Sequence, residues 1–508
     1  MSPNVGVVRK KGDSSLLTTV EQTRLRVSKN TEAKRKSQFG QFLTPAKTAA
    51  FMASLFPVAK GSCYLLDAGA GIGSLSAAFL ERWIFGDFHF RRMALDVFEI
   101  DNSLHPHLTQ TLAKYRNNPD FALTIRKTDF IHAAVDWLSG SLFAEPLPKY
   151  THAILNPPYK KINSNSAHRL ALRRVGIETV NLYSAFVALA VALAAPGGQI
   201  VAIIPRSFCN GPYYRPFREF IFKRAAIRHM HLFESRSKAF KDDAVLQENI
   251  IIRLERNGQQ GPVTVSTSTD DTFTDLATYE HPFDQIVYSD DSERFIHVPT
   301  SFKRNIETSS AISYTLADLG LMVSTGPVVD FRLKDHLHNM PGEGTVPLLY
   351  PCHFSSSGTT WPIAGMKKPN AILRNGDTEK WLYPSGFYCV VRRFSSKEEK
   401  RRIVASVVSP TDFDNAPVLG FENHLNLFHE NKRGLPEVLA HGLSLFLNST
   451  VVDENFRRYS GHTQVNATDL KRMKYPSRDS LSELGNWAMQ HKELTQTMID
   501  NKIGKLAV

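Results

Sequence analysis

An amide, two prolines and a phenol follow one another in the run Asn156-Pro157-Pro158-Tyr159. The prolines can neither continue a strand nor enter a helix interior, so they hold the chain in a stiff loop. Asn156 Oδ1 and the Pro157 carbonyl oxygen can each accept a hydrogen bond from an exocyclic NH2 group. Such bonds draw the nitrogen lone pair out of an aromatic ring and make the nitrogen nucleophilic. The run therefore predicts transfer of a group to a planar nitrogen.

The place of this run in the chain is typical of a binding site. It follows the apolar residues Thr151 to Leu155, which predict a buried parallel strand. Open α/β sheets bind their ligands beyond the carboxyl ends of such strands. Tyr159 offers a face on which a flat base can stack. The alternative is an ordinary turn capped by Asn156, and a donor site upstream is needed to decide between the two.

A glycine-rich turn supplies a candidate donor site. The stretch from Cys63 to Leu80 predicts a strand that ends at Asp67, a turn, and then a helix of small residues. In the turn, Gly69, Gly71 and Gly73 allow the backbone to approach a ligand closely. Their G-x-G-x-G spacing differs from the dinucleotide pattern G-x-G-x-x-G, so the turn alone does not identify the ligand.

Two further predicted strands end in acidic residues. The strand Leu95 to Asp101 places Glu99 where it can bind vicinal ribose hydroxyls. The next strand closes with Asp129 and Phe130, which suit an adenine ring. One acid at a strand end is more often a turn residue. Three in succession, each ending a strand before the Asn156 loop, indicate one nucleoside-binding edge.

Thr44 and Pro45 predict the start of a helix, with Thr44 as its cap and Pro45 in its first turn. The residues that follow have one apolar face, so the helix can be purely structural. Its exposed N-terminal amides would also suit a carboxylate ligand.

The bulk composition favours a basic globular protein. The chain has 508 residues, 42% of them hydrophobic, and a net charge of +12, and surplus base favours a polyanionic partner such as nucleic acid. The four cysteines show no C-x-x-C spacing, which indicates a reducing cytoplasm and no zinc site. No apolar run reaches the length of a membrane-spanning helix, so we expect no membrane association.

Alternating strands and helices, then two strands at 227–234 and 249–255, predict the α/β class. We expect a Rossmann-like, mostly parallel sheet that ends in an antiparallel hairpin. The predicted domain bounds are a basic arm at 1–37, a catalytic domain at 38–257, a connecting segment at 258–310, an α+β domain at 311–480 and a helical tail at 481–508.

The second half carries no motif for bond-making chemistry. It predicts strand, turn, strand over Leu319–Arg332 and a helix over Pro436–Tyr459. Its mixture of basic and aromatic residues suits docking onto a duplex. Asp377-x-Glu379-Lys380 is interpreted as a polar turn rather than a nuclease site.

The order of these motifs resembles the gamma class of N6-adenine DNA methyltransferases of restriction–modification systems, typified by the TaqI and PstI methylases. The resemblance covers residues 38–255 by motifs. It implies a class I fold that uses S-adenosyl-L-methionine (SAM) and no metal, and a target-recognition domain at 311–480. It also implies double-stranded DNA as substrate, a separate restriction endonuclease as functional partner, and a monomer.

The resemblance assigns residues to two subsites. The implied donor site comprises Thr44, Pro45, Asp67, Gly69, Gly71, Gly73, Glu99, Ile100, Asp129, Phe130 and Asn156. The implied site for a flipped adenine comprises Asn156, Pro157, Pro158, Tyr159 and Phe240, with Phe208 and Phe233 as alternatives to Phe240. Asp67 stands where some relatives have glutamate, and the carboxylate is kept.

Three other functions remain open from the sequence. An N-P-P-Y loop also occurs in methyltransferases that act on RNA bases or protein glutamines, because all present a planar NH2 group. The second alternative is a non-catalytic DNA-specificity subunit, and the third is a fused restriction–modification enzyme.

Overall fold

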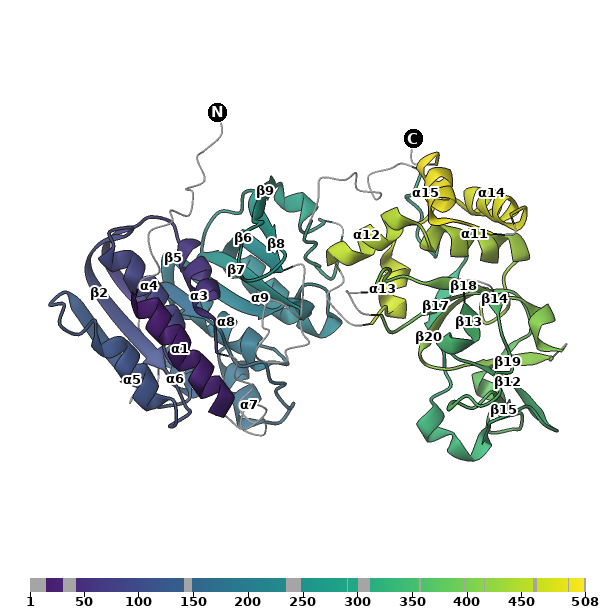
Figure 1. The fold of residues 1–508 in the computed structure, drawn as a ribbon, viewed down its shortest axis with the longest axis horizontal. Coiled ribbons are helices and arrows are strands. Elements are labelled where there is room, and N and C mark those ends of the chain that lie inside the picture. Colours follow the sequence, from purple (N-terminus) through teal and green to yellow (C-terminus); the bar gives the residue numbers. More distant parts are fainter. Residues whose placement is uncertain are drawn as a thin grey trace. The chain divides into compact units, whose positions relative to one another are not determined.

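In the computed structural model the chain forms two compact units, residues 1–300 and 301–508, and each is described by itself (Figure 1). The structure describes residues 15–30, 43–140, 149–233, 248–289, 291–299, 311–355, 358–395, 399–414, 416–459, 464–491 and 493–506.

Unit 1 is built on a nine-stranded sheet of described residues with the order β3-β2-β1-β4-β5-β7-β6-β8-β9. The strands are β1 (Lys60–Ala68), β2 (His89–Phe98), β3 (Phe121–Arg126), β4 (Tyr150–Leu155), β5 (Ala194–Pro205), β6 (Ala225–Phe233), β7 (Asn249–Arg256), β8 (Val263–Ser268) and β9 (Ala277–His281). The first five in spatial order run parallel, and β7 pairs antiparallel with both β5 and β6. The predicted α/β class, with its parallel sheet and terminal hairpin, is confirmed.

The sheet continues beyond the predicted hairpin. The segment 258–310 was expected to be a connection, but it contributes β8, parallel to β6, and β9, antiparallel to β8. Its many hydroxyl residues indicated a linker. In the fold one of them, Ser266, is hydrogen-bonded through its hydroxyl to the half-buried ring of His229 (2.7 Å) and to the buried ring of His231 (2.9 Å).

Helices cover both faces of the sheet in unit 1 (Figure 1). They are α1 (Ser15–Asn30), α3 (Ala46–Ser54), α4 (Ser74–Ile84), α5 (His105–Ala113), α6 (Phe130–Ser139), α7 (Ala167–Arg174), α8 (Leu182–Leu193) and α9 (Arg215–Arg224). Successive side chains of a strand point to opposite faces of the sheet, so the core has two parts. Leu65 packs with α3, α4 and α5, whereas Leu66 packs with α6 and α8. Burial on both faces explains why these strands are continuous apolar runs.

Unit 2 mixes short strands with helices. Its four-stranded sheet has the order β10-β20-β17-β18 and its five-stranded sheet the order β11-β15-β12-β19-β16. The strands are β10 (Met322–Thr325), β11 (Leu337–His338), β12 (Thr345–Leu349), β13 (Phe354–Ser355), β14 (Gly358–Thr359), β15 (Ala371–Leu373), β16 (Leu382–Pro384), β17 (Tyr388–Arg392), β18 (Ala405–Val408), β19 (Val418–Phe421) and β20 (Leu425–His429). The helices are α11 (Glu437–Leu447), α12 (Thr450–Tyr459), α13 (Ala467–Arg472), α14 (Arg478–Met489) and α15 (Gln496–Gly504).

Two predictions for unit 2 were wrong in detail. The single helix expected over 436–459 is divided into α11 and α12. The Asn448 side chain pairs with the backbone of Ala405 on β18, and Asp500 accepts hydrogen bonds from the Thr450 amide and hydroxyl at the start of α12. Tertiary partners thus break an apolar pattern that would otherwise continue. In Leu319–Arg332, β10 forms as expected, but Asp330–Arg332 is a 3-10 turn rather than a second strand.

The four cysteines are free thiols, and only Cys352 is exposed. Within the described residues, no helix combines the length and the apolar character that crossing a lipid bilayer requires.

Candidate active site

A cleft opens at the carboxyl ends of β1, β2 and β4, where parallel strands bring their last residues to one edge. It holds about 590 Å³ of empty space, including its open mouth. It is lined by Leu43, Gly69, Gly71, Phe98, Glu99, Ile100, Thr128, Asp129, Phe130, Asn156, Pro158 and Phe186. The structure thus brings together many residues that the sequence assigned to a donor, along with several that it did not.

The glycine turn forms one wall of the cleft. The backbone φ angles of Gly69, Gly71 and Gly73 are 80°, 57° and 86°, a region that other residues enter only at a cost. A Cβ atom on Gly71 would lie 3.0 Å from Leu43 Cδ2. The Gly69 amide donates to the Phe98 carbonyl oxygen at 2.9 Å, which fixes the turn to the end of β2. The turn therefore depends on glycine both for its backbone conformation and for the space beside Leu43.

Glu99 connects β2 to the same turn. Its Oε2 accepts a hydrogen bond from the Gly71 amide at 2.8 Å, and its Oε1 accepts one from the Asp101 amide at 2.7 Å. Burial raises the pKa of Glu99 above its usual value. Glu99 also lines the cleft, and a carboxylate is a hydrogen-bond acceptor for hydroxyl groups. The neighbouring Ile100 is half exposed and lines the mouth.

Asp67 lies beneath the turn rather than on the cleft lining. Its side chain is fully buried, and its Oδ2 accepts a hydrogen bond from the Ser76 hydroxyl at 2.6 Å. Among the described residues, its Oδ1 and the Ser74 hydroxyl are buried without a hydrogen-bond partner. Burial raises the pKa of Asp67 to about 7. Two orphaned polar atoms beside a glycine cradle fit a polar ligand at this end of the cleft.

Asp129 and Phe130 stand at the start of α6 and line the same cleft. Asp129 Oδ1 caps the helix by accepting from the His132 amide at 3.0 Å, and its Oδ2 pairs with His168 Nε2 at 3.0 Å. Burial alone would raise the pKa of Asp129, but the bonds from His168 and His132 lower it, and Asp129 in turn raises the pKa of His168. One carboxylate oxygen of Asp129 and one ring nitrogen each of His132 and His168 lie within 4.8 Å of one another.

Of the aromatic rings at the cleft, the sequence singled out Phe130 but not its two neighbours Phe98 and Phe186. Phe130 meets Phe98 at 5.1 Å and Phe186 at 5.0 Å between ring centroids. Phe98 ends β2 and Phe186 lies on α8, so both matched the pattern of ordinary core residues. His168, the partner of Asp129, was also missed. It lies on α7, 39 residues farther along the chain, and only the fold brings the two side chains together. These rings offer flat surfaces suited to a purine.

The Asn156 loop follows β4, and its amide has a defined orientation. Asn156 Nδ2 donates to Thr44 Oγ1 at 2.9 Å. The Tyr159 hydroxyl lies 3.1 Å from Asn156 Oδ1 and 3.2 Å from the Ile203 carbonyl oxygen, to either of which it can donate. Burial raises the pKa of Tyr159, so the phenol keeps its proton. Pro157 is buried and Pro158 lines the cleft.

The predicted cap at Thr44 was wrong. The helix α3 begins at Ala46 after Pro45, with no hydrogen bond from a capping side chain at its N-cap position. The Thr44 hydroxyl instead accepts from Asn156, and the Ala46 amide donates to Glu21 Oε2 at 2.8 Å. A distant carboxylate thus takes the place of a local cap.

Phe240 lies outside the described residues. The two alternatives proposed from the sequence, Phe208 and Phe233, are buried in separate core clusters. Phe208 packs against Phe217, and Phe233 lies 4.8 Å from the ring of His231.

Comparison with known proteins identifies the relatives of this chain. Residues 59–240 match the family model described as Eco57I restriction-modification methylase. The type II methyltransferase M.BsuBI of Bacillus subtilis is 53% identical, and the match covers 97% of this chain and 98% of that protein. The type II methyltransferase M.PstI of Providencia stuartii is 41% identical, with 97% of each chain covered.

A solved structure described as a DrdV–DNA complex shares the fold. It superposes with a TM-score of 0.50, covers 95% of this chain and 60% of that chain, and is 11% identical.

Replacing Gly71 with alanine is expected to weaken SAM binding roughly tenfold, since the left-handed backbone costs about 1–2 kcal/mol and the new methyl group presses on Leu43. Gly86→Ala is the matched control, because Gly86 has a φ of 82° with nothing near its Cβ position. Titration calorimetry measures both. Equal SAM affinity in the two variants would show that the turn does not shape the donor site.

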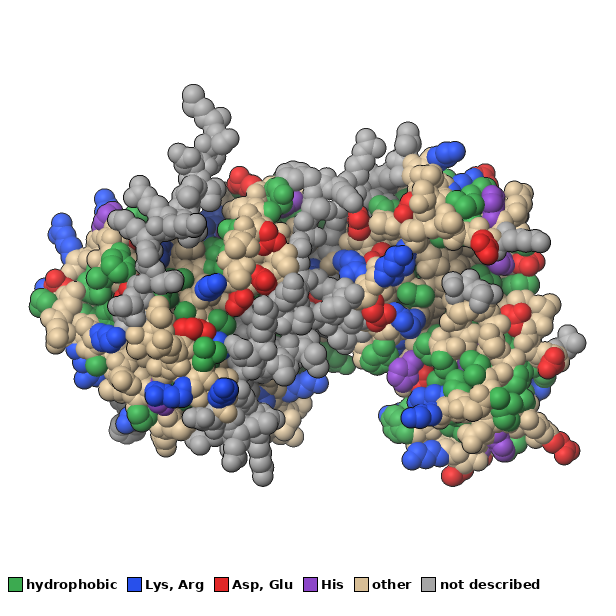
Figure 2. Space-filling model, in the orientation of Figure 1, with side chains coloured by type: hydrophobic (Ala, Val, Ile, Leu, Met, Phe, Trp, Pro, Cys, Tyr) green, Lys and Arg blue, Asp and Glu red, His purple; other side chains and the backbone are tan. Residues whose placement is uncertain are grey.

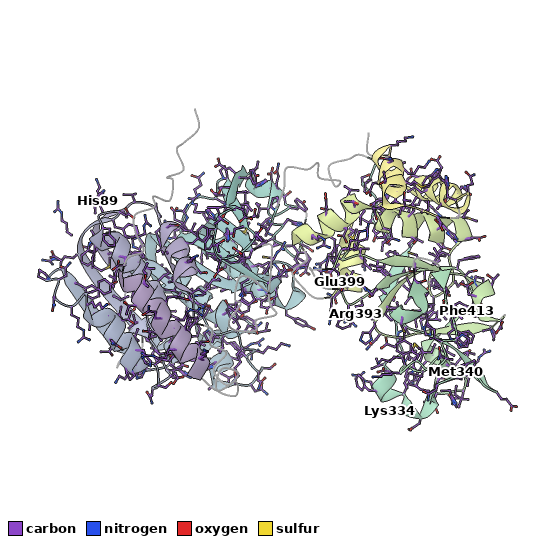
Figure 3. All side chains as sticks on the ribbon, in the orientation of Figure 1. His89, Lys334, Met340, Arg393, Glu399 and Phe413 are labelled. Carbon is purple, nitrogen blue, oxygen red and sulfur yellow. The ribbon has the colours of Figure 1, made fainter. Side chains whose placement is uncertain are left out.

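His168→Gln is expected to lower stability more at pH 5.5 than at pH 9. The folded pKa of His168 is raised above 6.5, so its ionic contribution is complete below that value and is lost as pH rises through the folded pKa. Asp129, with its lowered pKa, stays ionised throughout. Urea unfolding of the wild type and the variant at both pH values measures the difference, with the exposed His89→Gln as control (Figure 3). A pH-independent difference would contradict this charge pairing.

Proposed function

We propose that this chain, which belongs to the type II methyltransferases of restriction–modification systems, methylates N6 of adenine at a specific site in double-stranded DNA. The donor is SAM. The observation that carries the proposal is the orientation of the Asn156 amide, whose NH2 group is engaged by Thr44. The acceptor oxygen Oδ1, which lies 3.1 Å from the Tyr159 hydroxyl, is then the atom of this amide that can accept a hydrogen bond from an incoming amine.

Adenine N6 is a planar NH2 group with two donor hydrogens. Asn156 Oδ1 and the Pro157 carbonyl oxygen would each accept one of them, and this raises the nucleophilicity of the nitrogen. Tyr159 would stack against the base. The Tyr159 hydroxyl also lies near Asn156 Oδ1. When N6 donates to Oδ1, this hydroxyl can donate to the Ile203 carbonyl oxygen instead.

The residues of the cleft fit SAM through their chemistry. The buried acceptor of Asp67 and the glycine turn suit the methionine portion, Glu99 suits the ribose hydroxyls, and Asp129 with its neighbouring rings suits the adenine. SAM supplies a methyl group already activated by the positive charge on sulfur, so the proposal requires no metal. The residues then act by orienting the two reactants and by hydrogen bonding to the amine.

Unit 2 is proposed as the domain that reads the DNA. Phe331 is 64% exposed, and the guanidinium of Arg332 lies 5.5 Å from its ring. Lys334 and Met340 are exposed nearby in sequence, and Figures 2 and 3 show basic side chains around the corner of unit 2 that carries Lys334. Basic groups would hold phosphates, while an exposed ring can contact bases. The target adenine must leave the stack, at a cost of a few kcal/mol.

We further propose that the protein works as a monomer in the bacterial cytoplasm and protects sites that a cognate restriction endonuclease cuts. RNA bases and protein glutamines are less favoured substrates, because the relatives that span this chain are type II methyltransferases. Incubation with tritiated SAM and either duplex DNA, ribosomal RNA or protein separates these substrates.

Asn156→Ala is expected to lower methyl transfer roughly a hundredfold to a thousandfold, the usual effect of removing one preorganised hydrogen-bonding group. Duplex binding should persist. The assay follows tritium transfer to a duplex that carries the target site and identifies the methylated base by mass spectrometry. Asn165→Ala is the control, since it truncates an exposed amide farther along the same segment. Wild-type turnover by Asn156→Ala would remove Asn156 from the mechanism.

Substitutions of Tyr159 separate its ring from its hydroxyl. Tyr159→Ala is expected to weaken base stacking by about 1–3 kcal/mol, whereas Tyr159→Phe keeps the ring and loses only the hydrogen bond to Asn156 or Ile203. Fluorescence of 2-aminopurine at the target position measures flipping. The signal should fall in Tyr159→Ala and persist in Tyr159→Phe. Equal signals from both variants would exclude stacking on this ring.

A further inference from the structure

The N-terminal helix α1 packs against the back of the glycine turn. Val20 and Val27 of α1 share a buried cluster with Ile72, Ala77 and Leu104. Ile72 lies between two glycines of the turn. Figure 1 shows α1 running across the same face of unit 1 as α4. The sequence assigned residues 1–37 to a basic arm, and the family model begins only at residue 59, so neither gave this helix a place in the active site.

Glu21 connects α1 to the start of α3. Its Oε2 accepts the Ala46 amide at 2.8 Å. Arg24, which is 2% exposed, holds the same carboxylate through Nε at 3.0 Å and Nη2 at 2.7 Å to Oε1. A carboxylate at the N-terminus of a helix is favoured by the free amides and the helix dipole. The ion pair with Arg24 fixes where that carboxylate lies.

The start of α3 also holds the catalytic amide. Thr44, two residues before Ala46, is 5% exposed, and its hydroxyl accepts from Asn156 Nδ2 at 2.9 Å. Pro45 between them has its φ fixed at −59°. A shift of Ala46 therefore moves Thr44 with it. The described contacts form one continuous path from Glu21 through Ala46 and Thr44 to Asn156.

We propose that α1 is part of the catalytic unit and that Glu21 is a positioning residue for Asn156. The inference rests on the proposed adenine methylation and extends it to a helix outside the matched family model. Glu21 touches neither substrate nor donor in this account. It fixes the Thr44 hydroxyl, and Thr44 keeps the Asn156 amide turned so that Oδ1 faces the incoming amine.

Three variants test this path. Glu21→Ala removes the acceptor of the Ala46 amide, and kcat should fall roughly tenfold to a hundredfold, as expected when a reacting group is misplaced. Glu21→Gln retains an oxygen for that amide and should restore most of kcat. Gln22→Ala changes an exposed neighbour on α1 and should behave as wild type. The KM for duplex DNA should be unchanged in all three, because α1 acts on the amide and not on the duplex.

Hydrogen exchange gives a readout independent of turnover. In Glu21→Ala, the peptide that covers the start of α3 and the peptide that covers Asn156 to Lys161 should both exchange faster than in the wild type. In Glu21→Gln and Gln22→Ala they should not. If the wild type methylated no adenine, the proposed function would fail, while these exchange rates would still report on the path.

Two results would overturn the inference. One is wild-type kcat in Glu21→Ala. The other is an equal loss of kcat in Glu21→Ala and Glu21→Gln, with faster exchange confined to α3, because that pattern means that α1 contributes only to folding.

Discussion

The side-chain amide of Asn156 can face in one of two directions, and its hydrogen bonds hold it in one of them: the NH2 group donates to Thr44 Oγ1 at 2.9 Å, and the oxygen lies 3.1 Å from the Tyr159 hydroxyl. With the NH2 group engaged there, the oxygen is the atom of this amide that can accept a hydrogen bond from a planar amine. In the opposite orientation, the NH2 group of Asn156 would meet the NH2 group of the substrate, and two donors cannot form a hydrogen bond. The paired prolines support this choice, because they hold the backbone carbonyl of Pro157 beside the amide without help from regular structure.

The parallel sheet also brings three acidic side chains to the edge that carries Asn156. Asp67, Glu99 and Asp129 each end or follow a strand, and their carboxylates surround one cleft and its glycine turn. Burial favours the neutral forms of Asp67 and Glu99 and raises the pKa of both groups. A cationic sulfonium donor bound nearby would offset this effect of burial and favour the ionised forms of both carboxyl groups. The cleft is therefore better suited to a positively charged ligand than to an anionic dinucleotide.

The sequence could place residues with strong backbone constraints. Glycines with positive φ, paired prolines and acids at strand ends act through local geometry, so their spacing was enough to place Gly71, Glu99 and Asn156 at one cleft. Phe186 and Glu21 were missed. An apolar residue on a helix, or an acidic residue on a helix, has the same local sequence pattern whether it lies beside a binding site or elsewhere. The break between α11 and α12 and the strands β8 and β9 were missed for a similar reason, since Asn448 and Ser266 find their partners only in the folded chain.

The proposed mechanism depends on adenine being the base that is methylated at this edge of the sheet. Single-molecule sequencing of genomic DNA from cells that produce the wild-type protein tests it most directly, because it reports the modified base and its sequence context together. N6-methyladenine is expected at nearly every copy of one short sequence and nowhere else above background. Unmodified DNA, or methylation confined to cytosine, would contradict it.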